Sequence, residues 1–93
     1  RRSSDLVSDA MARMMKQMSS RQGQQVIAIT HLPQIAAQGE HHLFVYKENT
    51  DEQTLSHIRT LTEKERITEV AHMLSGSDIT QAAIENAKQL LGK

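Results

Sequence analysis

The sequence predicts an α/β fold with the order helix, strand, short helix, β-hairpin, helix, helix. Apolar residues recur at helical spacing over residues 4–20 and again over residues 62–91. The unbroken apolar run Val-Ile-Ala-Ile at residues 26–29 is typical of a strand covered on both faces, because a half-exposed strand would alternate. Residues 41–47 do alternate, and they indicate a second strand that begins a hairpin.

Length and composition limit the chain to one domain or part of one. Its 93 residues include 38% hydrophobic residues but only Phe44 and Tyr46 as aromatics, so we expect an aliphatic core. The absence of cysteine excludes disulfides, thiolate zinc sites and a cysteine nucleophile. Eleven basic and eleven acidic residues cancel, which argues against direct binding of nucleic acid. With no signal-like N-terminus and no long apolar run, we expect a soluble, cytoplasmic protein.

The first predicted helix, residues 4–20, carries an apolar stripe rich in methionine. Ser4 and Asp5 supply N-cap chemistry and early negative charge at its start. The stripe consists of Leu6, Val7, Ala10, Met11, Met14, Met15 and Met18. Such a stripe is more often ordinary core than an adaptable contact surface, so we expect it to be buried and keep the contact surface as the alternative.

The predicted strand at residues 26–31 ends in a histidine. Pro33 cannot donate to a sheet ladder, so the strand stops at Thr30 and His31. In open α/β sheets ligands bind beyond the carboxyl ends of the strands, which makes His31 the candidate binding residue. Residues 32–38 then predict a short helix with Pro33 in its first turn.

An antiparallel hairpin is predicted over residues 41–61. The charged residues 48–52 form its turn, and residues 53–61 form the weaker second strand. Alternation places two sets of side chains on opposite faces: His41, Leu43 and Val45 on one, and His42, Phe44 and Tyr46 on the other.

Two helices are predicted to complete the chain. Thr62 and Glu65 form a T-x-x-E capping box at the start of a helix over residues 62–75. Asp78 or Thr80 caps the last helix, for which we expect residues 79–91.

The remaining motifs predict no complete active site. His41 and His42 point to opposite faces of a strand, and no H-x-H or H-x-x-x-H pair exists, so we expect no metal site. His57 and His72 have no matching partner nearby in the sequence. No nucleophile-elbow pattern surrounds a serine, and no G-x-x-x-x-G-K-[ST] phosphate-binding loop occurs.

One longer string is more specific than any of these. Residues 26–37, V-I-A-I-T-H-L-P-Q-I-A-A, closely resemble the switch-histidine segment of ABC- and SMC-type ATPases. The form T-H-L-P-Q-I-A is similar to that of the RecN family of bacterial SMC-like DNA-repair ATPases. Residues 41–47 and 66–76 resemble the closing hairpin and helix of that family, so the resemblance covers nearly the whole chain.

This resemblance implies a fold, a function and a site. The chain would be a single partial domain, residues 1–93, from the C-terminal part of a P-loop NTPase head, with the switch-histidine strand and loop at residues 25–38. The parent would hydrolyse ATP with magnesium and act in recombinational repair of DNA double-strand breaks, near the nucleoid. The histidine that matches His31 contacts the γ-phosphate of ATP in the family, a role that suits an imidazole N–H at a strand end. The implied partners are the rest of the head, a second head in a homodimer, and DNA through the parent protein.

The departures from the family predict that the chain alone is inactive. The phosphate-binding loop, the signature motif and the Walker B carboxylates of the family would all precede Arg1, and residues 1–4 stand where its D-loop would run, with Ser4 in place of a common glycine. We therefore expect no tight ATP binding and no hydrolysis by these residues alone. An unpaired strand edge predicts self-association, with exchange of the first helix as one route. The alternative function is a stand-alone protein–protein interaction module without nucleotide chemistry.

Overall fold

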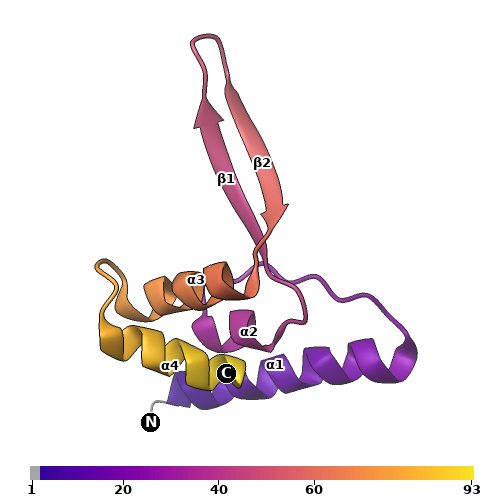
Figure 1. Cartoon of the computed structure of the whole chain (residues 1–93). Helices are drawn as coiled ribbons and strands as arrows, with labels where there is room; N and C mark the ends of the chain where they lie inside the picture. The colour runs from indigo at the N-terminus through magenta and orange to yellow at the C-terminus, as the bar shows by residue number, and fades with distance from the viewer. Residues whose placement is uncertain (1–2) are drawn as a thin grey trace.

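The structure is a computed structural model that describes residues 3–93. In chain order the described elements are α1 (Ser3–Gln22), α2 (Pro33–Gln38), β1 (Leu43–Asn49), β2 (Thr54–Thr60), α3 (Glu63–Ser75) and α4 (Gln81–Leu91). Figure 1 shows the helices gathered at one end of the molecule, with the hairpin of β1 and β2 projecting away from them. The element types agree with the predicted α/β class except at residues 26–31, where the predicted strand does not form.

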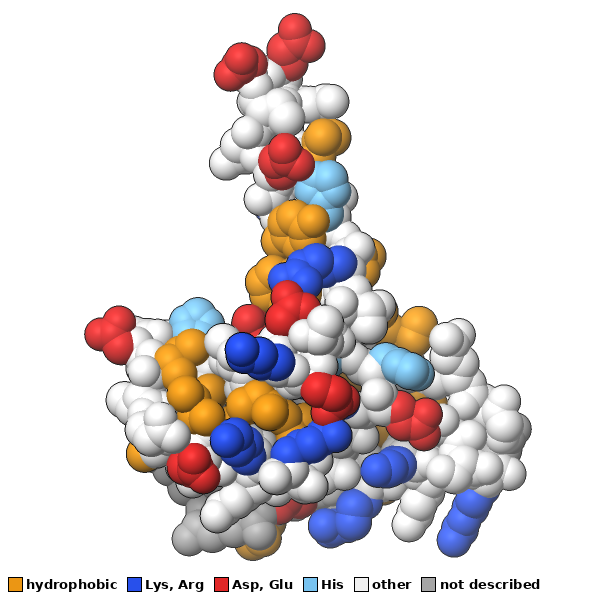
Figure 2. Space-filling model, viewed as in Figure 1, with side chains coloured by type: hydrophobic (Ala, Val, Ile, Leu, Met, Phe, Trp, Pro, Cys, Tyr) orange, Lys and Arg blue, Asp and Glu red, His pale blue; other side chains and the backbone are white. Residues whose placement is uncertain are grey.

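The hairpin forms as the alternation predicts. β1 and β2 pair antiparallel in a register that sets Phe44 opposite Arg59 and Tyr46 opposite His57. At the tip, the Thr50 hydroxyl donates to the carbonyl oxygen of Gln53 at 2.7 Å and accepts from its amide at 3.1 Å. Figure 2 shows acidic side chains at this tip and apolar side chains along the hairpin. The predicted antiparallel hairpin is thus confirmed, although Glu48 and Asn49, predicted in its turn, belong to β1, and residues 41–42 precede that strand.

The last two helices begin at the predicted caps. The Thr62 hydroxyl accepts from the Glu65 amide at 3.2 Å, and the Glu65 carboxylate accepts from the Thr62 amide at 3.0 Å, so the capping box is confirmed. Of the two candidate caps for α4, the structure selects Thr80, whose hydroxyl accepts from the Ala83 amide at 3.0 Å.

The core lies between α3 and α4, away from the hairpin. Its fully or nearly fully buried members are Val70, Ala71, Ala83 and Ala87. Three of these are alanines, whose small side chains let the two helix backbones approach closely. Larger aliphatic residues surround them, namely Ile67, Leu74, Ile84, Leu90 and Leu91. α2 packs on this pair of helices and also on α1.

The predicted buried strand at residues 26–31 is wrong for the described chain. Residues 23–30 carry no regular secondary structure, and the side chains of Ile27 and Ile29 are 73% and 101% exposed. A strand needs a hydrogen-bonded neighbour, and within residues 3–93 β1 and β2 pair only with each other. The apolar pattern is present, but the elements that would pair with it and cover it are not among the described residues.

The expected burial of the methionine stripe is also wrong. α1 packs through a different face, on which Ser8 and Ala12 are buried, and it contacts α2 alone among the described elements. Met11, Met14 and Met18 are exposed, as are Leu6 and Val7. Ala10 and Met15 of the stripe are half-buried, so the predicted burial fails for five of its seven residues, and the alternative, an adaptable contact surface, stays a prediction.

Two further predictions concern the N-terminus. The side chains of Ser4 and Asp5, which were predicted to cap the helix, and residues 1–2 of the predicted D-loop lie outside what the structure describes, whereas the backbone of Ser3 and Ser4 already belongs to α1.

Within residues 3–93, no helix is both long enough and apolar enough to cross a membrane.

Candidate functional site around His31

His31 lies at a bend immediately before α2, and its side chain is exposed. Hydrogen bonds hold the backbone beside it. The Leu32 amide donates to the Thr30 hydroxyl at 3.0 Å, while the Leu32 carbonyl accepts from the amides of Ile35 at 3.1 Å and Ala36 at 3.0 Å. The imidazole therefore projects from a hydrogen-bonded turn, with its ring nitrogens available to a ligand. The predicted strand does not form, but His31 still stands at the entrance to the predicted short helix.

The other end of α2 is held by Arg66 of α3. The Arg66 side chain is only 7% exposed, although it is charged. Its Nη2 atom donates to the carbonyl oxygens of Ala36 at 3.0 Å and Ala37 at 3.3 Å, and also to that of Gly39. These carbonyls lie at the end of a helix, where intrahelical partners run out. Arg66 thus satisfies the C-terminal carbonyl groups of α2.

Gly39, the residue directly after α2, adopts an extended backbone with φ −66°. A Cβ atom at this position would lie 3.2 Å from the His41 carbonyl oxygen and 4.0 Å from Arg66 Nη2. Close approach of the neighbouring groups, not a left-handed backbone, accounts for the glycine.

Arg66 is not among the residues predicted from the sequence to form the site. A signal was present, because Arg66 precedes Val70 by four residues and so lies on the buried side of its helix. A charged residue at such a position requires acceptors from elsewhere in the fold. These acceptors lie 27 to 30 residues earlier in the chain, and no local pattern connects them to Arg66.

His42 is half-buried close to the same cluster. Burial lowers its pKa, the nearby positive charge of Arg66 lowers it further, and the carboxylate of Glu69 acts in the opposite direction. Its Nδ1 atom is buried without a hydrogen-bond partner among the described residues. The structure therefore favours a neutral His42 in the loop that joins α2 to the hairpin.

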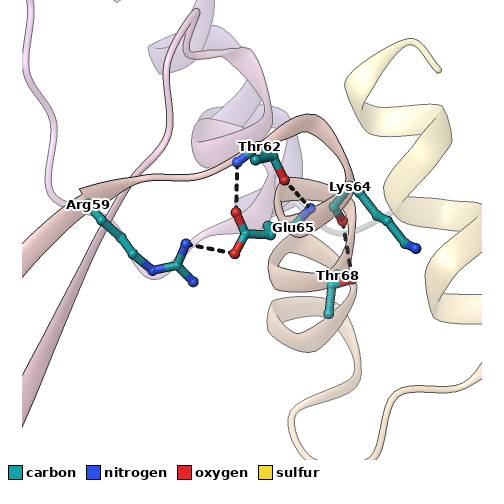
Figure 3. A network of polar contacts seen from close by, with 5 residues as sticks. All are labelled: Arg59, Thr62, Lys64, Glu65 and Thr68. Atoms are coloured by element: carbon teal, nitrogen blue, oxygen red, sulfur yellow. Dashed lines mark hydrogen bonds and ion pairs between the residues drawn. The ribbon is translucent and has the colours of Figure 1, made fainter.

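A second polar cluster lies where the hairpin meets α3 (Figure 3). Arg59 Nη1 is 2.6 Å from Glu65 Oε2, and the guanidinium carbon of Arg59 stands 6.0 Å from the centre of the Phe44 ring. The Thr62 amide and the Arg59 guanidinium both lower the pKa of Glu65. An open groove of about 310 Å³ runs beside this cluster, and both Lys64 and Glu65 line it. Because basic and acidic side chains both line the groove, its charge does not indicate a particular class of ligand.

The other histidines are dispersed. His57 Nε2 lies 2.8 Å from Glu48 Oε2, and its ring stacks on Tyr46 with centroids 5.1 Å apart. His41 and His72 are exposed on other elements. In the part of the chain that the structure describes, no group of three or more His, Asp or Glu side chains is placed to hold a metal ion.

Comparison with known proteins identifies the family to which the chain is similar. No protein-family model matches the chain. The chain is 51% identical over 67 residues to the DNA repair protein RecN of Deinococcus radiodurans, covering 72% of this chain and 12% of that protein. It is 39% identical over 69 residues to RecN of Bacillus subtilis, covering 74% of this chain and 12% of the relative. With RecN of Halalkalibacterium halodurans it shares 35% identity over 85 residues, 91% of this chain and 15% of the relative.

These similarities, together with the α/β fold, place the chain in a class with bacterial proteins that are named DNA repair proteins. The chain belongs to the RecN family. The matched part spans 12–15% of the length of these curated relatives.

Proposed function

We propose that the chain is the C-terminal part of an ABC/SMC-type P-loop NTPase head in a DNA-repair ATPase, and that His31 contacts the γ-phosphate of ATP in the complete head. The supporting observation is the exposed imidazole on a hydrogen-bonded bend at the start of α2. The family relationship supports the role in DNA repair, for which we propose recombinational repair of double-strand breaks.

The chemistry of His31 follows from its surroundings. In phosphoryl transfer, negative charge is spread over the oxygens of the transferred group, and a donor already in place stabilises that charge without reorganising. The turn at Thr30 and Leu32 holds the backbone on which the imidazole stands. His31 would therefore donate a ring N–H to a γ-phosphate oxygen. The family implies magnesium, but residues 3–93 offer no cluster of ligands for it, so we assign it to no residue of this chain.

The rest of the head is the partner that we propose for residues 23–30. Ile27 and Ile29 are exposed on a segment that pairs with no strand among the described residues, and added strands would satisfy both the backbone and the side chains. The chain alone would then hydrolyse no ATP. In the parent, two heads would form a homodimer in the cytoplasm and reach DNA at the nucleoid through other parts of the protein.

A second candidate function is a protein–protein interaction module without nucleotide chemistry. The exposed methionines of α1 favour it, because flexible, polarisable side chains suit adaptable contact surfaces. The two functions differ in what they require of His31, since the module needs no imidazole at the bend.

The test measures ATP hydrolysis by the complete protein that contains this chain. His31→Ala should lower kcat on the order of 10²-fold, as for loss of a donor to a charged transition state. His41→Ala is the matched control, because His41 is also exposed but lies beyond α2, and turnover should not change. Circular dichroism should show both variants folded. Unchanged turnover in a folded His31→Ala variant would exclude His31 from the mechanism and favour the interaction module.

A further inference from the structure

We infer that Arg66 is a positioning residue, which holds α2 at its C-terminal end and thereby sets the direction of the His31 bend at the other end. The inference rests on the role proposed for His31. Arg66 lies on α3 and would not contact the nucleotide itself, but it would position His31, which is proposed to contact it.

The contacts form a short connected path. Arg66 Nη2 donates to the Ala36 carbonyl at 3.0 Å, and the Ala36 amide donates to the Leu32 carbonyl at 3.0 Å. Leu32 is the residue after His31, and its amide is hydrogen-bonded to Thr30. A single residue, Ala36, therefore links the guanidinium of α3 to the turn that carries the imidazole.

α2 needs such support because it is short. It has 6 residues, and a helix of that length is not stable without tertiary contacts. Its apolar contacts come from Ile35 and Ala37, which are buried against the other helices. These contacts resist separation, but they are less directional than hydrogen bonds. Arg66 Nη2, whose two hydrogens are shared among three carbonyl oxygens, adds directional hydrogen bonds between the C-terminal end of α2 and α3.

An arginine is suited to this position. Burial of its charge is costly unless carbonyl oxygens replace water, and the end of α2 supplies three of them. All three contacts are made by Nη2 at the tip of a planar group of fixed geometry, whereas a lysine ammonium turns freely on a flexible stem. Arg66 Nε is buried without a hydrogen-bond partner among the described residues. The residue is anchored as well, because α3 starts at the Thr62 capping box and packs through Val70 in the core.

The experiment is a double-mutant cycle on ATP turnover by the complete protein. Arg66→Met keeps the volume of the side chain and removes its donors, and it should lower kcat on the order of 10- to 100-fold by misplacing His31. In the His31→Ala background, Arg66→Met should lower turnover no further. Arg59→Met is the matched control, because Arg59 is a partly exposed arginine that pairs with Glu65 and does not contact α2. It should change turnover in neither background.

Hydrogen exchange of the backbone amides is measured in parallel, since it does not depend on ATP. Arg66→Met should speed exchange at the α2 amides while the α3 and α4 core amides stay protected. Arg66→Lys serves as the second variant and should lower turnover less than Arg66→Met.

The outcomes separate this inference from the function on which it rests. If the effects of Arg66→Met and His31→Ala multiply, or if exchange in α2 is unchanged, Arg66 does not act through His31 and the inference fails. Loss of protection in α3 and α4 together with α2 would assign Arg66 a general role in stability, and this result would also overturn the inference. If His31→Ala leaves turnover unchanged, the proposed function fails, and the positioning role for nucleotide chemistry fails with it.

Discussion

Arg59 Nη1 lies 2.6 Å from Oε2 of Glu65, so the end of β2 is paired with the first turn of α3. The other oxygen of the same carboxylate accepts from the Thr62 amide at 3.0 Å. One side chain thus completes the helix cap and holds the foot of the projecting hairpin (Figure 3). Apart from this junction with α3, the hairpin packs on no other element among the described residues, so we expect the junction to contribute to its direction.

The helix cap should contribute measurably to stability. Thr62→Ala removes the hydroxyl that accepts from the Glu65 amide, and it should lower the free energy of unfolding by about 1 kcal/mol. Urea denaturation measures this change. Thr68→Ala is the control, because the Thr68 hydroxyl only donates to Lys64 within the same helix and is exposed, so a change below about 0.5 kcal/mol is expected. Equal losses in the two variants would contradict the role of the cap.

The core between α3 and α4 should respond strongly to loss of volume. Val70 is 0% exposed, and Val70→Ala should cost about 2 kcal/mol through lost burial and an added cavity. Val45, which is 63% exposed on the hairpin, provides the same substitution at the surface, where we expect a loss below about 0.5 kcal/mol. Thermal unfolding of the two variants compares them. A larger loss of stability in Val45→Ala than in Val70→Ala would contradict the placement of the core between α3 and α4.

Stability should depend on pH through His42. Its pKa is lowered in the folded protein, chiefly by burial and then by Arg66, so the unfolded chain binds more protons below its ordinary pKa of 6.5. The free energy of unfolding should therefore rise with pH between the lowered pKa and 6.5, and should fall as the pH drops through that window. Denaturation series from roughly pH 5 to 8 cover it.

Two variants test this assignment. His42→Gln should flatten the pH dependence, whereas His41→Gln, at an exposed neighbour, should leave it unchanged. A slope that persists in folded His42→Gln would assign the titration to another group.

The methionine face of α1 should drive self-association of the isolated chain. Met11 and Met14 are exposed, and replacing both by glutamine should lower the apparent mass in light scattering at high concentration. Lys16→Gln, also exposed on α1, is the control and should not change it. A chain that is strictly monomeric at high concentration before any substitution would contradict the prediction.

The sequence by itself determined the elements whose interactions are local. The capping box needs only Thr62 and Glu65, three residues apart, and the hairpin needs only alternation around a polar turn. Pro33 and the residues after it likewise sufficed to predict α2 and to place His31 directly before it.

Only the tertiary structure decided which faces are covered. Residues 26–29 and the methionine stripe have the patterns of buried elements, but burial depends on the elements that pack against them. The described chain supplies none for residues 26–29 and only α2 for the helix that carries the stripe. Arg66 is a charged residue that is buried nonetheless, because carbonyl groups up to 30 residues away in the sequence accept hydrogen bonds from it. Hydrogen bonds between neighbours in the chain follow from spacing, whereas coverage and long-range hydrogen bonds exist only once separate elements have met.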